Sequence, residues 1–132
     1  MVSSITSFLI AAIFFSIIDF IWLSLVAKRL YRQQIGFLLR DKANISAAVI
    51  FYILFIIGLV IFAINPALDR GNNQIYHAAL YGGLYGLFTY ATYDLTNLST
   101  IKGWPLTISL IDLAWGIVIS TVTATITVLI LA

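Results

Sequence analysis

Three aspartates lie within otherwise apolar stretches of this 132-residue chain, and they are its best candidates for chemistry: Asp19, Asp94 and Asp112. None of these stretches contains a lysine or an arginine. An aspartate near the middle of a bilayer costs about 2.5–3.5 kcal/mol on insertion scales, so protonation, water, hydrogen bonds or a bound cation must offset it. The aspartates therefore favour a polar pocket for a proton, a cation or an amine-bearing solute. The alternative is that they only link helices through hydrogen bonds.

Two of the aspartates are each followed, three residues later, by a tryptophan. Asp19 precedes Trp22, and Asp112 precedes Trp115. Residues three apart share one face of a helix, so each indole is expected beside its carboxylate. The two segments are predicted to run in opposite directions. We therefore interpret the repeated Asp-x-x-Trp element as two similar local arrangements, not as an internal duplication.

The third aspartate has polar neighbours on its own helix face. Tyr90 and Asn97 lie four residues before and three residues after Asp94, so we expect both to donate hydrogen bonds to it. The complete set of candidate ligand- or cation-binding residues is Asp19, Asp94, Asp112, Trp22, Trp115, Tyr90 and Asn97.

The sequence offers little support for other kinds of site. It has no cysteine, and its one histidine, His77, is predicted on the opposite side of the membrane from the aspartates. It contains no phosphate-binding glycine loop and no plausible Ser-His-Asp set. Three carboxylates could hold a hard divalent cation, but we expect no resident metal, and no cofactor can be identified.

The composition predicts an integral membrane protein. Hydrophobic residues make up 62% of the chain and charged residues only 9%, whereas soluble domains carry roughly 25% charged residues. Crossing the hydrocarbon takes about 20 apolar residues in a helix. Four segments are long enough, at about 4–27, 45–64, 75–98 and 105–131, and the third is the least apolar. Pro66, just beyond the second segment, is expected to mark its end.

Backbone polar groups in lipid must be satisfied within the chain, so these segments are expected to be helices. Short connections between them predict an all-α, antiparallel four-helix bundle that forms a single membrane domain. In the third segment, Gly82 and Gly86 lie four residues apart and present a surface of small residues to another helix. We expect a possible homodimer through these two glycines, with the lipid bilayer as the main partner and no nucleic acid.

The basic residues predict the orientation of the bundle. Six of the seven lie in the connections after the first and third segments, and Arg70 lies in the other connection. By the positive-inside rule, the six-residue side is cytoplasmic and both termini are external. The six are Lys28, Arg29, Arg32, Arg40, Lys42 and Lys102. An alternative use of residues 30–39 is a short amphipathic helix lying at the membrane interface.

The same topology brings the aspartates to similar depths. Asp19 lies nine residues before Lys28, and Asp94 lies eight residues before Lys102. Asp112 lies ten residues after Lys102. At 1.5 Å per residue, all three fall roughly 12–15 Å from the basic interface, in the cytoplasmic half of the membrane.

Several motifs together resemble a family of small predicted bacterial membrane proteins catalogued as a domain of unknown function. They are Asp19-x-x-Trp22, Tyr31 and Gly36, Phe51-Tyr52, Gly86, Thr92-Tyr93-Asp94-Leu95-Thr96-Asn97, Gly103-Trp104-Pro105 and Asp112-Leu113-Ala114-Trp115-Gly116. The resemblance covers nearly the whole chain. It implies a multi-pass protein of the bacterial inner membrane with four helices, and it implies no activity.

Three functional hypotheses remain open. The first is a small transporter or a solute- or cation-binding protein with a cytoplasm-facing pocket around the three aspartates. The second is a lipid-modifying membrane enzyme with Asp94 or Asp112 as acid or base. The third is a non-catalytic subunit or assembly factor of a membrane complex.

Overall fold

The computed structural model describes residues 3–132, and over that range the chain contains only helices and their connections. The helices are α1 (Ser4–Trp22), α2 (Lys28–Ile35), α3 (Ile45–Leu59), α4 (Asn65–Leu68), α5 (Gln74–Thr100) and α6 (Leu106–Leu131). Two π-helical turns, Leu23–Ala27 and Val60–Ile64, join α1 to α2 and α3 to α4. A 3-10 turn, Gly36–Leu38, follows α2. The predicted all-α fold of four helical columns is therefore confirmed.

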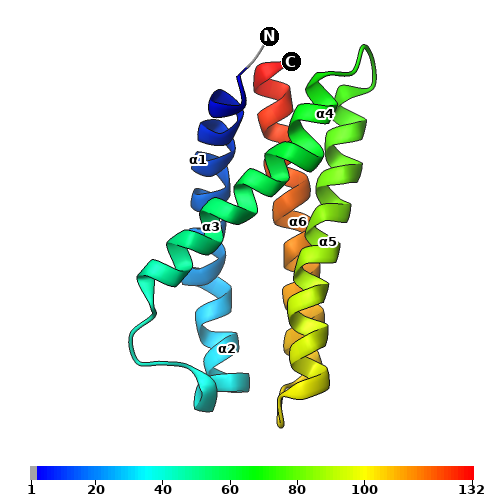
Figure 1. The fold of residues 1–132 in the computed structure, drawn as a ribbon. Helices are drawn as coiled ribbons and strands as arrows, with labels where there is room; N and C mark the ends of the chain where they lie inside the picture. Colours follow the sequence, from blue (N-terminus) through cyan, green and yellow to red (C-terminus); the bar gives the residue numbers. More distant parts are fainter. Residues whose placement is uncertain (1–2) are drawn as a thin grey trace.

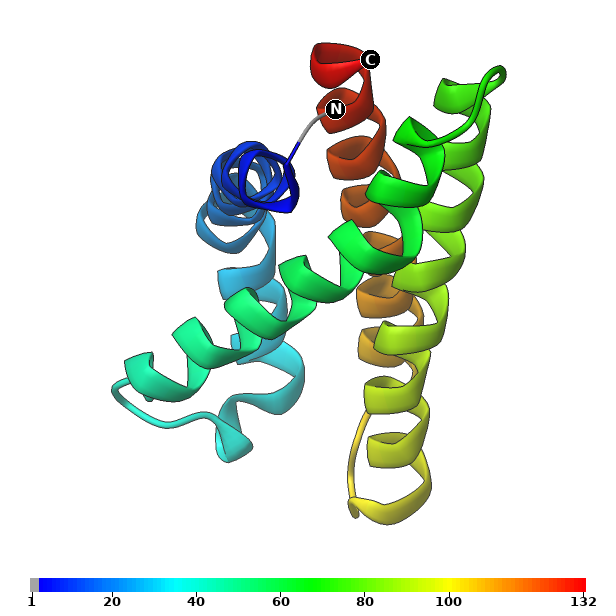
Figure 2. The ribbon, with the colours of Figure 1, turned by 45° about the horizontal axis from the view of Figure 1, so that its top comes forward.

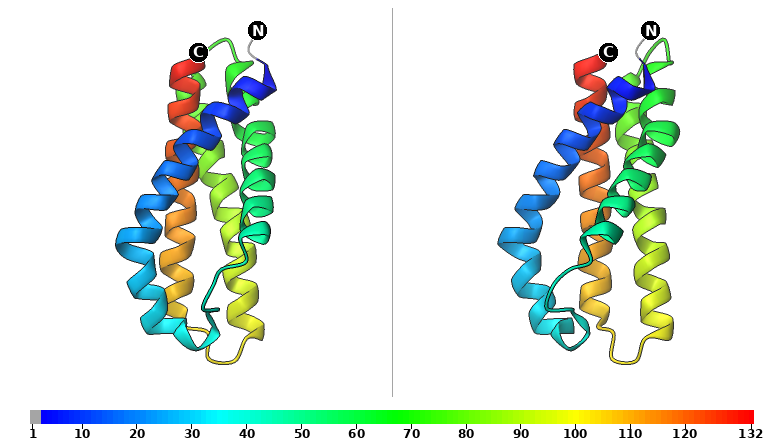
Figure 3. Two further views of the ribbon diagram at one scale, coloured as in Figure 1. Left: turned by 90° about the vertical axis from the view of Figure 1, so that its left-hand side faces the viewer. Right: turned by 60° about the vertical axis from the view of Figure 1, so that its left-hand side comes forward.

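The four columns form an up-and-down bundle. Figure 1 shows both ends of the chain at one end of the bundle, with α2 and the α5–α6 connection at the other. α5 and α6 lie side by side and antiparallel along their length, and they share the most extensive helix–helix contact. α3 crosses this pair obliquely (Figure 2), and α1 is tilted against it in the side views of Figure 3.

The outer surface of the bundle is apolar. Along α1, for example, a row of side chains four residues apart is exposed, beginning with Ile5 and continuing through Leu9, Ile13 and Ile17. Three helical stretches are long and apolar enough to cross a membrane: Ser4–Leu38, Ile45–Leu68 and Leu106–Leu131. Exposed apolar area on this scale is rare in soluble monomers and suits contact with lipid. α5 has the length of a membrane span but a more polar sequence.

The α5–α6 interface is built from small residues. A Cβ atom added at Gly86 would collide with the carbonyl of Gly116, and one added at Gly82 would collide with Ala124 and the carbonyl of Ser120. The missing side chains let the two helices approach closely. The two glycines predicted as a homodimer surface are thus covered by α6 of the same chain. A dimer through them would require α5 and α6 to separate.

The apolar core occupies the half of the bundle nearer the termini. Its largest fully buried apolar side chains include Phe15 from α1, Leu59 from α3, and Ile119 and Val128 from α6. In the other half, residues of all four columns leave a cavity, which is described below. The packing is therefore uneven along the bundle axis.

Two predicted helix ends differ from the structure. The first column does not end near residue 27, because α2 continues it to Ile35. The second continues past residue 64 to Leu68, with Pro66 in the first turn of α4. Proline has no backbone N–H to donate, and the π-helical turn directly before it is where the regular α-helical hydrogen bonds are interrupted. A π-helical turn precedes each continuation, and sequence periodicity does not reveal such turns.

Candidate functional site

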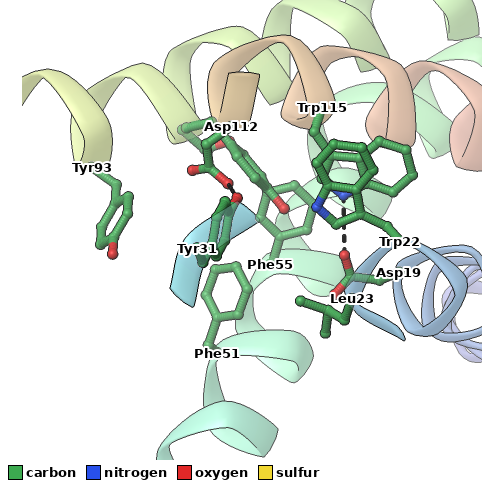
Figure 4. A pocket seen from close by; sticks show the side chains of 11 residues that line it. Asp19, Trp22, Leu23, Tyr31, Phe51, Phe55, Tyr93, Asp112 and Trp115 are labelled. Atoms are coloured by element: carbon green, nitrogen blue, oxygen red, sulfur yellow. Dashed lines mark hydrogen bonds between the residues drawn. The ribbon is translucent and has the colours of Figure 1, made fainter. Parts of the chain in front are cut away.

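A cavity of about 340 Å³ lies between all four columns and is partly open to the outside. Its walls carry two carboxylates among mainly aromatic side chains (Figure 4). The lining residues are Asp19, Trp22, Leu23, Tyr31, Phe51, Phe55, Thr89, Tyr90, Tyr93, Asp112 and Trp115. The volume falls within the range of small-molecule sites.

Asp19 is held by donors from two other columns. The indole N–H of Trp115 donates to its Oδ1 at 3.1 Å, and the hydroxyl of Tyr52 donates to its Oδ2. The residue is 8% exposed, so little water reaches it. Hydrogen bonds to both oxygens offset part of the cost of burying a carboxylate. Asp19 therefore ties α1 to α3 and α6 and also forms part of the cavity wall.

The two Asp-x-x-Trp elements pair with each other. The ring of Trp22 stacks on that of Trp115, with centroids 4.4 Å apart and planes 7° from parallel. Trp115 donates its hydrogen bond to Asp19 in the opposite element, not to Asp112, its neighbour in sequence. Both indoles line the cavity, but the hydrogen bond of Trp115 crosses between helices instead of staying within its own Asp-x-x-Trp element.

Asp112 accepts a hydrogen bond from an unexpected donor. The hydroxyl of Tyr31 in α2 donates to its Oδ1 at 2.6 Å. Figure 4 marks this hydrogen bond with a dashed line. In an unbroken α-helix, Tyr31 would lie about 120° around the axis from Asp19. One extra residue in the π-helical turn reduces that angle to about 20°. The turn at Leu23–Ala27 thus brings Tyr31 onto the face of the column that lines the cavity.

Asp94 does not line the cavity but lies directly behind it. Asp94 is 0% exposed, and its carboxyl group lies next to that of Asp112. The hydroxyl of Ser109, one turn before Asp112 in α6, donates to the backbone carbonyl of Asp94 at 3.3 Å. Asp19 and Asp112 thus face the cavity, and Asp94 lies behind Asp112.

The donors expected for Asp94 are directed elsewhere. Within residues 3–132, neither carboxyl oxygen of Asp94 accepts a hydrogen bond from an N–H or hydroxyl donor. Tyr90 instead lies in the cavity wall, where its ring packs edge-on against Phe55 at a centroid distance of 5.7 Å. Asn97 lies one turn after Tyr93 and does not line the cavity. The expected bonds from Tyr90 and Asn97 to Asp94 are therefore wrong.

The chain matches one known protein family over nearly its whole length. Residues 4–129 match a family described as a predicted membrane protein, DUF2177. The chain belongs to this family. The match includes every residue of the cavity, so the site lies in the part of the chain that the family shares. No curated protein and no solved structure matches the chain.

In this DUF2177 member, the hydrogen-bond donors that reach Asp19 and Asp112 from other columns, and part of the aromatic wall, were not predicted from the sequence. Tyr31 was assigned to a connection that the structure shows as helix. Tyr52 and Phe55 were included in an apolar span without a role, although a tyrosine within such a span is a signal that its hydroxyl has a partner. The other missed lining residues are Leu23, Phe51, Thr89 and Tyr93.

The chemistry available to this family member follows from the lining. Carboxylates attract a positive charge, and the faces of tryptophan and tyrosine rings add cation–π attraction. No lysine, arginine or histidine is among the residues that line the cavity. Within residues 3–132, no group of three histidine, cysteine or acidic side chains has the geometry of a metal site. The arrangement therefore suits a small organic cation better than a metal ion.

Proposed function

We propose that the protein binds a small organic cation, an amine or a quaternary ammonium ion, in this cavity, as a small membrane transporter or solute-binding protein. The proposal rests on one observation: Asp19 and Asp112 line the same aromatic cavity of about 340 Å³, and no basic side chain lines it with them. Hydrogen bonding alone does not account for a cavity of this size between the two carboxylates.

The aromatic residues give the proposal its specificity for organic cations. The faces of the stacked indoles, Trp22 and Trp115, and the ring of Tyr90 border the same space as the two carboxylates. Cation–π attraction reaches about 2 kcal/mol in a desolvated site, and carboxylates add a longer-range attraction. A fully hydrated inorganic cation would gain little from the rings. An alkylammonium ion would bury its apolar groups against them.

The orientation in the membrane completes the proposal. α5 is less apolar than the three clear spans, but it packs along the whole of α6 and so occupies the same depth. Its polar side chains include Asp94, which is shielded from lipid. The basic residues of α2 and of the α5–α6 connection lie at the end of the bundle away from the termini. We therefore place that end, and the nearby cavity, on the cytoplasmic side.

Ligand binding by the purified protein in mild detergent tests the proposal. The probes are tetraethylammonium and n-hexylamine, with n-hexanol as the uncharged control. Quenching or enhancement of tryptophan fluorescence reports binding, because Trp22 and Trp115 line the cavity. Both cations are expected to bind at least tenfold more tightly than hexanol. Asp112→Asn is expected to remove most of that difference, since it neutralises one carboxylate.

A matched control is available at the surface. Asp69 is exposed and lies between α4 and α5, outside the cavity, so Asp69→Asn changes the net charge equally without altering the site. Equal affinity for hexylamine and hexanol, or unchanged cation binding by Asp112→Asn, would contradict the proposal. Counterflow of radiolabelled tetraethylammonium in proteoliposomes then distinguishes a transporter from a binding protein.

A further inference from the structure

The contact between Asp94 and Asp112 has a chemical requirement that the proposed binding site does not explain. Asp94 is fully buried between α5 and α6, and no N–H or hydroxyl of residues 3–132 donates to its carboxyl oxygens. Its side chain is directed at the carboxyl group of Asp112, which faces the cavity. A buried polar side chain normally has a partner, so the carboxyl group of Asp112 must satisfy it.

Two carboxyl groups can satisfy each other only through a proton. Ionised carboxylates are acceptors only, and two of them side by side away from water repel each other. One proton between them supplies a donor and removes one of the two charges. A proton, or another cation, at this contact would remove the repulsion and supply the missing partner.

The side chains around Asp94 and Asp112 favour a proton over another cation at their contact. The hydroxyl of Tyr31 in α2 donates to Oδ1 of Asp112, so this carboxyl group already has one donor besides any proton that it shares with Asp94. No lysine, arginine or histidine is among the charged groups that act on Asp94. Two other titratable groups face the pair, Tyr90 and Tyr93 of α5. Asp19 of α1, with its partner Tyr52 of α3, lies farther along the cavity.

We propose that Asp94 and Asp112 form a proton-binding pair, which holds one proton while the cavity is empty and releases it when an organic cation binds beside Asp112. This exchange rests on the proposed function. The O–H bond of the Asp94 carboxyl breaks, its electron pair stays on the carboxylate, and the proton leaves through the cavity to water. One positive charge enters as one leaves, so the net charge of the site does not change.

The division of roles follows from burial. Asp112 reaches the cavity and can contact a solute, whereas Asp94 is enclosed and can contact only Asp112. Asp94 is therefore a positioning and proton-carrying residue that acts through Asp112. Such an exchange would let a proton gradient drive movement of the cation in the opposite direction.

The first part of the test needs no solute. Infrared difference spectra of the wild-type protein are expected to show the C=O band of a protonated carboxyl group at neutral pH. Asp94→Asn should remove that band and still fold, because its amide donates the same hydrogen bond to Asp112. Asp69→Asn should keep the band. A wild-type spectrum without the band would overturn the proton pair.

The second part counts protons during binding. Tetraethylammonium has no titratable group, so calorimetry in two buffers with different ionisation enthalpies measures only protons released by the protein. We expect about one proton released by the wild type and by Asp69→Asn, and almost none by Asp94→Asn. The wild-type Kd should fall about tenfold per unit rise in pH where the pair titrates, and the Kd of Asp94→Asn should stay constant.

The outcomes separate the two proposals. Tetraethylammonium binding without proton release would overturn the exchange and leave the proposed function intact. A protonated carboxyl band without any cation binding would overturn the proposed function, and the exchange with it, while supporting the proton pair.

Discussion

The indole of Trp22 in α1 stacks face to face on the indole of Trp115 in α6, with ring centroids 4.4 Å apart. Trp115 also donates its N–H to Asp19, one turn before Trp22. One side chain thus joins two helices by a stacking contact and by a hydrogen bond to a buried carboxylate. These two contributions can be separated by mutation.

Replacing Trp115 by phenylalanine keeps an aromatic ring but removes the N–H. Asp19 then loses one of its two donors, and we expect the free energy of unfolding in detergent to fall by about 1–3 kcal/mol. The control is Phe88→Leu, a change at a lipid-exposed position of α5 that should have little effect. In a double-mutant cycle, Trp115→Phe should cost much less when Asp19 is already alanine, which has no acceptor for the indole N–H. Strict additivity of the two changes would argue against the hydrogen bond.

Tyr31→Phe tests the link between α2 and the site. It removes the donor that lies 2.6 Å from Asp112, so we expect a loss of about 1–3 kcal/mol in unfolding free energy. Cation binding should also weaken, because the carboxylate of Asp112 is no longer held in place by this donor. Tyr76→Phe, at an exposed position near the start of α5, serves as the control. Identical stability and binding in the two variants would show that Tyr31 does not act on Asp112.

The π-helical turn can be tested by removing or inserting one residue. Leu25 lies in this turn and is largely exposed, so Leu25→Ala should be nearly neutral. Deleting Leu25 removes the extra residue, so Tyr31 stands eleven residues after Asp19 and stays about 20° from it around an unbroken α-helix. The deletion should therefore keep Tyr31 facing Asp112 and keep most cation binding. Inserting an alanine after Leu25 should instead turn α2 by about 100° and weaken binding as much as Tyr31→Phe does. Full binding by the insertion variant would rule out this role of the turn.

Gly86→Ala tests the close approach of α5 and α6. The added Cβ would collide with the backbone of Gly116, and relief requires the helices to move apart. Overpacking of this kind costs about 1–3 kcal/mol, so thermal unfolding should occur at a lower temperature. Gly36→Ala adds the same methyl group where no atom lies within 4 Å and should change the unfolding temperature little. An equally stable Gly86→Ala variant would mean that the interface is looser than the structure shows.

The orientation can be tested directly, because the chain has no cysteine and single cysteines can be introduced. Asn72 lies in the α4–α5 connection, and Lys42 lies between α2 and α3. In intact cells, a membrane-impermeant maleimide should label Asn72→Cys. Lys42→Cys should react only after the membrane is opened. The reverse pattern would place the cavity end outside the cell.

Much of the fold could be predicted from single segments. The all-α bundle followed from the length and hydropathy of the apolar runs, since transfer to lipid is a local, nearly additive property of side chains. α5, predicted at 75–98, was found at Gln74–Thr100. The second helix was predicted to end before Pro66, but it continues to Leu68. In a sequence, a proline that a helix tolerates cannot be distinguished from one that ends it.

The site could be predicted only in part. Asp19, Trp22, Tyr90, Asp112 and Trp115 were all expected in a pocket, and all five line the cavity. Unusual polar or aromatic residues in apolar segments were sufficient to select them. Their hydrogen-bond partners were not predicted, because partners lie on other helices and helical spacing describes only one helix at a time.

The sequence by itself determined that this protein is embedded in lipid and that it is helical, and it singled out three aspartates as candidates for its chemistry. Only the tertiary structure decided that Tyr31 reaches Asp112, that Asp94 faces another carboxyl group, and that the glycines of α5 pack against α6 of the same chain. The physical reason is rotation about the helix axis. One residue inserted or removed turns a helix face by about 100°, and hydropathy hardly changes with such a rotation, whereas every contact between side chains does.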